Sequence, residues 1–481
     1  MGPMPMSLMN IASLAAITAL AGLGCHKKNG EIGGRLAEIT FDSSKRFQTI
    51  VGWEATVQAG HEQPGFSRFG DSAITLAVDE LGINRLRLEV RSGIENATDH
   101  WSAKQAGAID EKNWRCVRYI ITNDDKDPHH INEQGFQWAE LDLKVEEVVL
   151  PVKRRIEANG ESLYLSLNYV AFANSKCAEN AVEHMNPEEY AEFILATVNH
   201  LRAKYGLVPA ALEIILEPDN TRHWQSGTTI GHAIVAVTRR LRAAGLKLEI
   251  IAPSTKSMSA AVTYLADIAK VPGAIEEVSE FSYHRYAGVS IEDLRAVAAA
   301  TRRYGRRSAM LEHIGSGYQD LHEDLEIGIN SAWQQYVLAF PSGPAGEENG
   351  ETYVSLNVSD TLNPVIRLSE RSRFLRQYFR HIRRGAVRFG ARSSSKRFHP
   401  LAFVNTDGRH VVVVRADKGG AFTIAGLPPG TYGFSYTTAD SSAFTERGIA
   451  AGAVFSASIP DAGVATVFAK AVTTPASGAR R

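Results

Sequence analysis

Two glutamates, Glu217 and Glu312, are the residues of this sequence best placed to do chemistry together. A mostly apolar run at 212–216 leads into the first, and a similar run at 308–311 leads into the second. Pro218 follows Glu217 directly, and because proline has no N–H to donate to a sheet, the run ends there. A β/α barrel holds its catalytic groups at the carboxyl ends of buried parallel strands, so both positions suit catalysis.

A third strand-like run, at 280–286, also ends in polar side chains, those of His284 and Tyr286. For either glutamate alone, the alternative is that it opens a following helix, where the helix dipole favours an acid. Three polar tips on three strand-like runs favour one shared face instead. We therefore expect Glu217 and Glu312 to face each other, with His284 and Tyr286 beside them.

Two carboxylates across one cleft can cleave a glycosidic bond. One protonates the leaving oxygen, while the other attacks the anomeric carbon or activates a water molecule. A separation of about 5 Å gives retention of configuration, and about 6.5–9.5 Å gives inversion. His284 and Tyr286 would hydrogen-bond and orient the nucleophile. No Gly-rich phosphate loop, Ser-His-Asp signature or metal-binding helix motif competes for this face, so we expect neither a cofactor nor a metal.

The elements that must position these residues alternate between strands and helices, which indicates an α/β fold with a parallel sheet. Strand-like runs are centred near 50, 85, 165, 214, 250, 282, 310 and 354, with a helix predicted at 325–340. Eight such runs are the number that a (β/α)8 TIM barrel needs, and we assign it residues 47–384.

From residue 385 the pattern changes to short strands separated by turns such as Asp407-Gly408 and Pro428-Pro429-Gly430. Turn signals at this regular spacing predict a C-terminal all-β sandwich. An alternating stretch at 35–41 predicts one more strand for it. The side domain would therefore comprise residues 34–46 and 385–475.

Composition sets the broad class. The 481 residues carry a net charge of −1, which argues against a nucleic-acid or anionic-membrane partner. A local basic cluster at Arg380, Arg383 and Arg384 is interpreted as a solvated helix face. An acidic, histidine-containing run at 124–130 has no standard metal-ligand spacing and is interpreted as a solvated loop.

Residues 1–25 are interpreted as an export leader, because the apolar run at 8–24 is too short for a comfortable membrane span. Cys25 directly after it would be the lipidated residue of a bacterial lipoprotein. We thus expect an exported protein, periplasmic, secreted or anchored at the cell surface, with no other membrane contact. Cys116 and Cys177 are compatible equally with a disulfide and with buried free thiols.

Further motifs accompany the two glutamates: FQTIVGW at 47–53, YHRY at 283–286, LEH at 311–313, IRRGAVR at 382–388 and AFVNTDG at 402–408. Together they resemble glycoside hydrolase family 30, the glucosylceramidase and xylanase family of the retaining clan A. The resemblance covers about residues 35 to 470. It implies a barrel joined to a β-sandwich, Glu217 as acid/base, Glu312 as nucleophile, a carbohydrate substrate and net retention.

One position departs from that family. Its members have Asn directly before the acid/base, where it binds the sugar 2-hydroxyl, and this sequence has Leu216. Asn220, Asn168 or Arg87 could substitute, or the sugar could be altered at carbon two. The alternative function is a surface glycan-binding protein with weak or no turnover, and a further alternative is inverting hydrolysis by the same pair.

The substrate cleft needs walls as well as catalytic groups, and four residues are candidates: Trp53, Glu54, Trp224 and Tyr318. Trp224 follows the acid/base loop, so it could be a platform on which a sugar ring stacks. It could equally pack against the next helix.

Overall fold

The computed structural model describes residues 36–172, 183–341 and 352–470. From Ala37 onward the chain forms one compact unit. The predicted leader, Cys25 and Cys177 lie outside the described residues. Cys116 forms a disulfide, so the free-thiol alternative for this residue is wrong. Its partner is not among the described residues.

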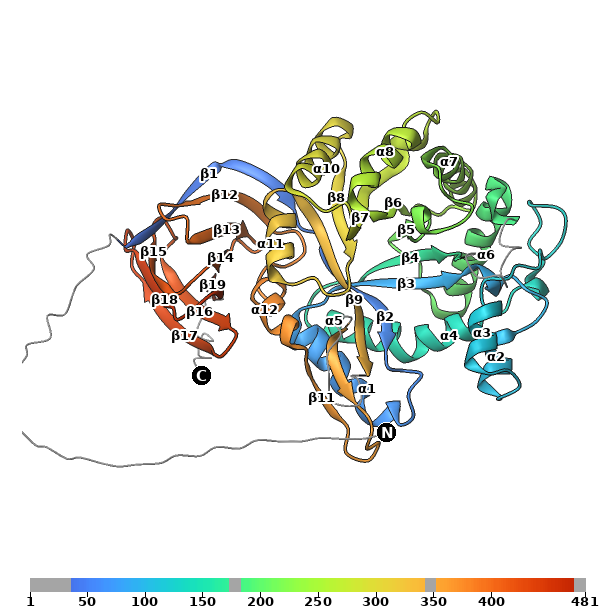
Figure 1. Ribbon diagram of the computed structural model, residues 1–481, viewed down its shortest axis with the longest axis horizontal. Coiled ribbons are helices and arrows are strands. Elements are labelled where there is room, and N and C mark those ends of the chain that lie inside the picture. Colours follow the sequence, from blue (N-terminus) through green and yellow to red (C-terminus); the bar gives the residue numbers. More distant parts are fainter. Residues whose placement is uncertain (1–35, 173–182, 342–351, 471–481) are drawn as a thin grey trace, which may run out of the picture. The chain divides into compact units, whose positions relative to one another are not determined.

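Eight parallel strands form a closed barrel (Figure 1), as predicted. Pairing of β8 with β9, and of β9 with β2, closes the ring. The strands are β2 (Gly52–Ala59), β3 (Arg85–Arg91), β4 (Tyr164–Val170), β5 (Ala211–Glu213), β6 (Glu249–Ser257), β7 (Val278–Ala287), β8 (Arg307–Glu312) and β9 (Asn330–Pro341).

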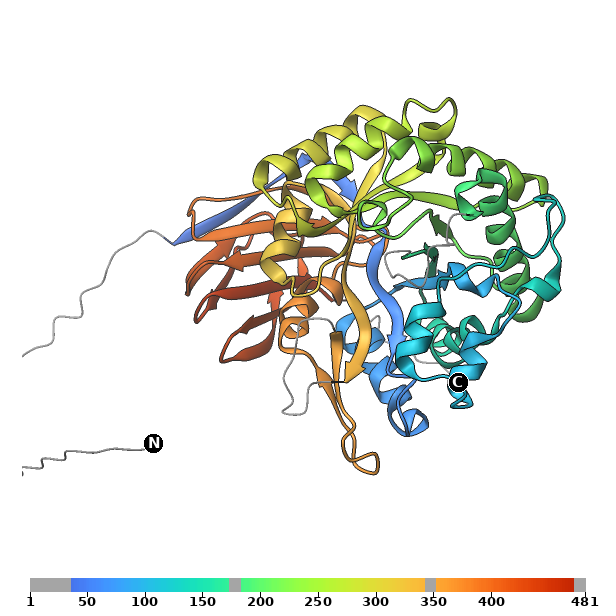
Figure 2. The ribbon, with the colours of Figure 1, turned by 45° about the vertical axis from the view of Figure 1, so that its right-hand side comes forward.

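Helices surround this ring (Figure 2), and they begin and end where the sequence supplies capping residues. In α10 (Ile291–Tyr304) the hydroxyl of Ser290 accepts from the N–H of Asp293, and Gly305 ends the helix at φ 62°. The others are α1 (Phe66–Thr75), α4 (Ala139–Lys144), α5 (Leu150–Ala158), α6 (Pro187–Tyr205), α7 (Gly227–Ala243), α8 (Met258–Ile268), α9 (Ala274–Glu277), α11 (Tyr318–Glu326) and α12 (Glu370–Phe379). Short helices α2 (His100–Gln105) and α3 (Glu111–Val117) lie in the long segment after β3.

The eighth barrel strand is not the predicted one. The sequence prediction gave a helix at 325–340 and a last strand near 354, but β9 occupies most of that helix. The later strand, β10 (Thr352–Asn357), pairs with β9 outside the ring, and β11 (Val365–Leu368) follows it at the edge. Both faces of β9 are buried, so its residues show no period of two, and its apolar spacing also fits a helix.

The interior of the barrel carries charge on its amino-terminal side. Arg85 binds Glu280 through two hydrogen bonds, of 3.0 and 2.6 Å, and also forms an ion pair with Glu54. All three side chains are completely buried. We call these residues the charged layer. By contrast, the outward side chains of the strands pack with the helices in one large apolar core.

The second sheet contains nine strands and includes the N-terminal strand β1 (Ala37–Thr49), which lies between β12 (Val387–Ser393) and β15 (Gly420–Ile424). The other strands are β13 (Phe398–Val404), β14 (His410–Ala416), β16 (Gly430–Thr438), β17 (Ser442–Ile449), β18 (Phe455–Ile459) and β19 (Gly463–Ala469). Although β18 and β16 lie near opposite ends of the strand order, Phe455 packs 6.2 Å from Phe434. The sheet therefore folds over a shared core, as a sandwich does.

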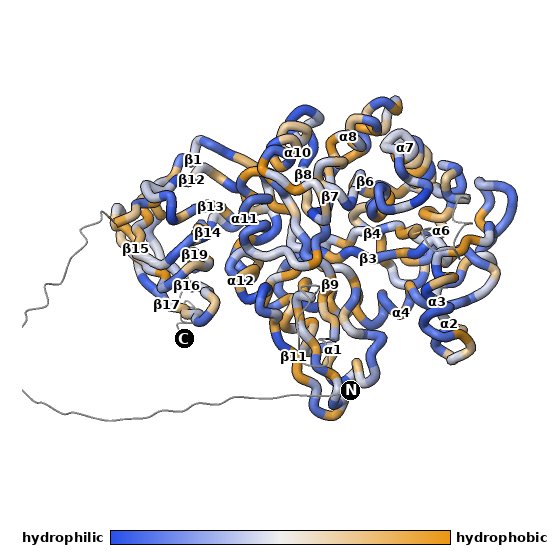
Figure 3. The backbone as a smooth tube through the Cα atoms, viewed as in Figure 1, coloured by the Kyte–Doolittle hydropathy of each residue, from blue (hydrophilic) through white to orange (hydrophobic). Residues whose placement is uncertain are grey.

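Hydrophobic and hydrophilic residues alternate over short distances along the chain (Figure 3). Among the described residues, no helix combines the length and the apolar character needed to cross a membrane.

Candidate active site

Glu217 and Glu312 meet at the carboxyl end of the barrel. Glu312 is the last residue of β8. Glu217 lies after the end of β5, on a segment that hydrogen-bonds to the neighbouring strands β4 and β6. The N–H of Leu216 donates to the carbonyl of Tyr169 at 3.0 Å, and that of Glu217 donates to Ser254 at 3.0 Å. One oxygen from each glutamate and one ring nitrogen of His284 all lie within 4.8 Å of one another.

Glu217 has an unusual backbone conformation. Its φ of 46° is in the left-handed region, which non-glycine residues rarely adopt. The turn that follows closes with a hydrogen bond of 2.8 Å from the N–H of Asn220 to the carbonyl of Glu217. Such strain persists only where the surrounding structure imposes it, and here it fixes the direction of a side chain at a cleft.

Two side chains contact the Glu217 carboxylate. His284 Nδ1 lies 3.0 Å from Oε1, and the Asn220 amide donates to Oε2 at 2.8 Å. Burial raises the pKa of Glu217, but the hydrogen bond and charge of His284 outweigh it, so the pKa lies below its usual value. Burial lowers the pKa of His284, but its hydrogen bond to Glu217 and the charge of Glu312 outweigh burial, so this pKa lies above its usual value. These opposite shifts favour an ionised Glu217 that accepts a hydrogen bond from a protonated His284, and the two groups titrate as a pair.

The Glu312 carboxylate has a different environment. The Tyr286 hydroxyl donates to Oε1 at 2.9 Å, and the Arg87 guanidinium forms an ion pair with Oε2. Arg87 also donates to the carbonyl of Leu311 at 3.1 Å and to Glu89 at 3.3 Å. Although burial opposes it, the charges of Glu312 and nearby glutamates hold the pKa of Arg87 well above its usual value. A carboxylate that accepts from two donors is in the form required of a nucleophile.

The structure thus brings together six of the sequence candidates: Glu217, Glu312, His284, Tyr286, Arg87 and Asn220. A seventh, Asn168, lies on β4 opposite Glu89 and Glu213. It is fully buried, and neither atom of its amide has a hydrogen-bond partner among the described residues. A buried amide without partners costs free energy, which makes Asn168 a residue suited to contact a ligand.

Three cleft candidates are placed elsewhere. Trp53 stacks on Phe379 at 4.5 Å and donates from its indole to the carbonyl of Ile382 at 2.7 Å. Glu54 belongs to the charged layer. Both stand near the start of β2, whereas the active face of a barrel is at the ends of its strands. Tyr318 stacks on Phe374 at 4.8 Å.

Trp224 is also a packing residue rather than an exposed platform. Only 1% of it is exposed, and its ring lies 5.4 Å from that of Tyr190 and 6.0 Å from that of Tyr169. The observed ring contacts are packing contacts, but with β4 and α6, which precede Trp224 in the chain, and not with the next helix as expected.

Sequence reasoning missed two acidic residues of the site. Glu89 contacts Arg87 at 3.3 Å near the end of β3. Glu213 ends β5, where burial raises its pKa to about 7 although the charge of Arg87 lowers it. The available signal was a period of two. Glu89 continues the alternate charged positions of Arg85 and Arg87, and Glu213 interrupts the apolar run at 212–216.

Side-chain atoms of Glu217, His284 and Glu312, one from each, lie close enough together to bind a metal cation. However, the Arg87 guanidinium already neutralises Glu312, and the raised pKa of His284 favours its protonated form, which cannot bind a metal. The donor set therefore fits a proton-transfer site better than a metal centre.

No family model and no curated protein sequence matches this chain. Solved structures do match it, over almost its whole length. The catalytic domain of GH30 xylanase C from Talaromyces cellulolyticus aligns with a TM-score of 0.64 at 17% identity, covering 90% of this chain and 100% of that one. The chain has the fold of the GH30 xylanases.

Two further solved structures share this fold. An endo-β1,6-glucanase aligns with a TM-score of 0.62 at 16% identity, covering 91% of this chain and 96% of the other. A conserved exported protein from Bacteroides fragilis aligns with a TM-score of 0.64 at 11% identity, covering 90% and 100%. At these identities the similarity concerns the fold, so the chemistry has to be argued from the site.

Proposed function

We propose that this protein is a glycoside hydrolase that cleaves β-glycosidic bonds with retention of configuration. The observation that carries the proposal is the facing pair Glu217 and Glu312, with one oxygen of each within 4.8 Å of the other. This spacing supports the retaining geometry, for which the carboxyl groups stand about 5–5.5 Å apart, over the inverting one at about 6.5–9.5 Å. Xylanases and a glucanase with the same fold support a carbohydrate substrate.

In the first step, Glu312 attacks the anomeric carbon while Glu217 protonates the leaving oxygen. Arg87 and Tyr286 hold the attacking carboxylate by both its oxygens, so its direction is fixed before the substrate arrives. The product is a glycosyl ester on Glu312. In the second step, Glu217 removes a proton from water, which attacks the anomeric carbon and releases the sugar.

The pairing with His284 lets Glu217 change roles. Before the first step, the proton on His284 passes across the 3.0 Å contact to Glu217, which then donates it to the leaving oxygen. When Glu312 becomes an ester, its negative charge disappears, and both neighbouring groups then bind a proton less tightly. Glu217 is therefore ionised in the second step, which is the form that can accept a proton from water.

We infer that the protein is exported, because the apolar run at 8–24 followed by Cys25 has the form of a leader. Export would bring the protein into contact with extracellular or periplasmic glycans. A lipid anchor at Cys25 would hold it at the cell surface. Mass spectrometry of the mature N-terminus tests both inferences.

A second candidate, glycan binding without turnover, is favoured by Leu216. Its side chain packs with Tyr119 and Val170 in a small apolar cluster, and so supplies no hydrogen bond at the position where Asn would bind a 2-hydroxyl. The retained carboxylate pair and its donors favour the hydrolase.

Hydrolysis of aryl β-glycosides and β-linked oligosaccharides decides between them. The panel comprises glucoside, xyloside, fucoside, galactoside and N-acetylglucosaminide, with wild type, Glu312→Gln and an exposed control, Glu276→Gln. We expect turnover by wild type and the control, and a loss of about 10³-fold or more in Glu312→Gln. NMR detection of the first-formed anomer tests retention. Binding of glycans without hydrolysis, by folded wild type, would support the second candidate.

A further inference from the structure

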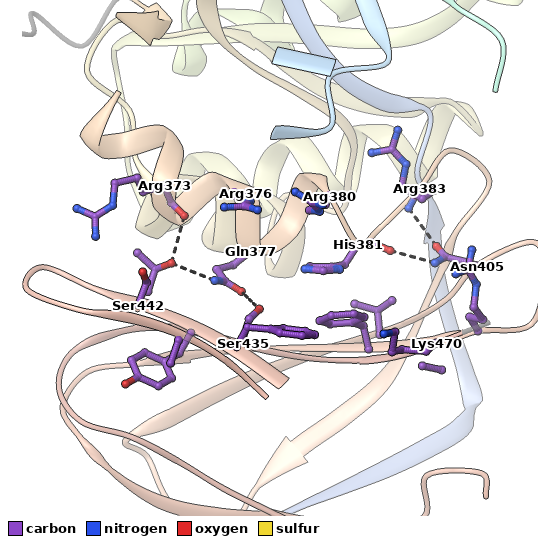
Figure 4. A pocket seen from close by; sticks show the side chains of 18 residues that line it. Arg373, Arg376, Gln377, Arg380, His381, Arg383, Asn405, Ser435, Ser442 and Lys470 are labelled. Carbon is purple, nitrogen blue, oxygen red and sulfur yellow. Dashed lines mark hydrogen bonds between the residues drawn. The ribbon is translucent and has the colours of Figure 1, made fainter. Parts of the chain in front are cut away.

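A groove of about 730 Å³ lies between α12 and the nine-stranded sheet (Figure 4). Six cationic side chains line it: Arg373, Arg376, Arg380, Arg383, Arg409 and Lys470. None of the residues that line it belongs to the carboxylate cluster of the active site. Arg380 and Arg383, interpreted from the sequence as part of a solvated helix face, border this groove, and the Arg380 side chain is 39% exposed.

The charge that faces the groove is positive. Among the described residues, no Asp or Glu lines it. Each of the six cations pairs with a carboxylate outside the lining. Arg376 and Arg380 share that of Glu80, at 2.7 Å each, so one positive charge is left unbalanced. The other four partners are one each: Glu370, Glu161, Asp407 and Glu446. Burial and the charge of Arg380 lower the pKa of Arg376 in spite of Glu80, which is consistent with an excess of cations.

An aromatic surface forms another part of the groove. Phe444 is 54% exposed and stacks on Phe468 with ring centroids 6.1 Å apart and planes 23° apart. Phe468 in turn stacks on His381 at 3.8 Å. Burial, with the charges of the nearby arginines, lowers the pKa of His381 to about 3, so its ring is neutral and adds to an uncharged planar surface.

Hydrogen bonds between the two walls hold the groove in shape. The Gln377 amide donates to the hydroxyl of Thr437 at 3.0 Å and accepts from that of Ser435 at 2.8 Å. At the other end, Asn405 accepts from the N–H of Arg383 and donates to the carbonyl of His381, both at 3.0 Å. Figure 4 shows Gln377 of the helix bonded to Ser435 on the strand below it, and Asn405 bonded to the segment that follows the helix. A ligand would therefore meet a preformed surface.

We propose that this groove is a second glycan-binding site, which takes an anionic oligosaccharide segment. The apolar face of a sugar ring would stack on Phe444, and its carboxylate or sulfate would bind the guanidinium groups of Arg376 and Arg380. Arginine forks match such planar or tetrahedral anions, and an exposed aromatic ring offers the stacking face. The choice of a sugar rests on the proposed function, whereas the preference for an anion rests on the groove itself.

Binding is measured by calorimetry on full-length Glu312→Gln protein, which does not turn the ligand over. The probes are a uronic-acid oligosaccharide, a sulfated oligosaccharide and a neutral oligosaccharide of equal length. In this background, Phe444→Ala and Arg380→Gln test the groove. Leu362→Ala and Arg295→Gln are matched controls, since these side chains are exposed elsewhere.

We expect an anionic probe to bind at least about tenfold more tightly than the neutral one, with a preference that declines as salt increases. Each groove variant should weaken anion binding by about tenfold, and the controls should not. Of the two anionic probes, the tighter one identifies the charged group. Equal binding of neutral and anionic probes, or anion binding unchanged in both groove variants, would overturn the proposal.

Failure of the groove proposal can be told from failure of the hydrolase proposal. In an otherwise wild-type chain, Phe444→Ala and Arg380→Gln should leave kcat/KM on a small aryl glycoside unchanged. Groove-dependent anion binding by a protein that hydrolyses no glycoside would sustain this inference and reject the hydrolase. Hydrolysis without groove-dependent binding would do the reverse.

Discussion

His284 Nδ1 and Glu217 Oε1 lie 3.0 Å apart. The Glu217 carboxylate also accepts a hydrogen bond from the Asn220 amide, but an amide does not titrate, so of these two partners only His284 can exchange a proton with it. The carboxylate and the imidazole shift each other's pKa in opposite directions, downward for Glu217 and upward for His284. The proton needed for the first step of hydrolysis therefore belongs to the pair rather than to Glu217 alone.

Replacement of His284 should change the pH dependence of hydrolysis. In wild type, the pair loses its proton only as the pH rises through the elevated pKa of His284. In His284→Asn the proton must reside on Glu217, so the alkaline limb of kcat/KM should move to lower pH. We expect a loss of about 100-fold at alkaline pH and a smaller loss at acidic pH. A pH profile whose alkaline limb stays in place would contradict the pairing.

Removal of the Tyr286 hydroxyl should weaken the nucleophile without disturbing the fold. Tyr286→Phe leaves Glu312 with Arg87 alone, so the direction of the carboxylate is less well fixed. We expect kcat/KM to fall by about 10–100-fold, while the melting temperature changes little. Tyr304→Phe, in α10, is the matched control. Equal activity of Tyr286→Phe and wild type would show that the hydroxyl does not assist Glu312.

The sequence predicted that Glu217 and Glu312 lie close together, as the structure shows, because its signal is local. Glu217 and Glu312 each interrupt an apolar run, and a closed barrel leaves one face on which strand ends can meet. His284 and Tyr286 carried the same signal. The barrel followed from the alternation of elements and the count of eight strands, although the eighth strand itself was misassigned.

What the sequence could not supply depends on burial. The segment that forms β9 is covered on both faces, so no periodicity distinguished it from a helix. Trp53 was assigned to the cleft from its residue type, but its place near the start of β2 directs it to Phe379 instead. No feature of the sequence indicated that Arg380 and Arg383, which follow α12, border a groove, because the sheet on its other side is distant in sequence.

Substitution at Leu216 should alter discrimination at the sugar 2-position. Leu216→Asn buries an amide beside Tyr119 and Val170, which we expect to lower the free energy of unfolding by about 1–3 kcal/mol. If the amide reaches the 2-hydroxyl, the ratio of kcat/KM for a 2-hydroxy and a 2-deoxy aryl glycoside should rise about tenfold. Leu216→Met, which keeps the apolar contact, is the control. An unchanged ratio in folded Leu216→Asn would show that this position does not contact the sugar.

The charged layer should contribute stability that depends on pH. Burial raises the pKa of Glu280, but Arg85 and Arg307 outweigh it and lower the pKa from 4.5 to about 2. Because the folded value lies below the unfolded one, the ion pair stabilises the fold above about pH 4.5, and this contribution is lost as the pH falls towards 2.

Glu280→Gln should therefore lower the free energy of unfolding by about 3–5 kcal/mol near neutral pH, since it leaves the buried Arg85 with Glu54 alone. Denaturant titration measures the loss, and the exposed Glu276→Gln should change it by less than about 0.5 kcal/mol. The difference between Glu280→Gln and wild type should shrink as the pH is lowered. A difference that stays constant with pH would show that packing, and not the charge of Glu280, stabilises the barrel interior.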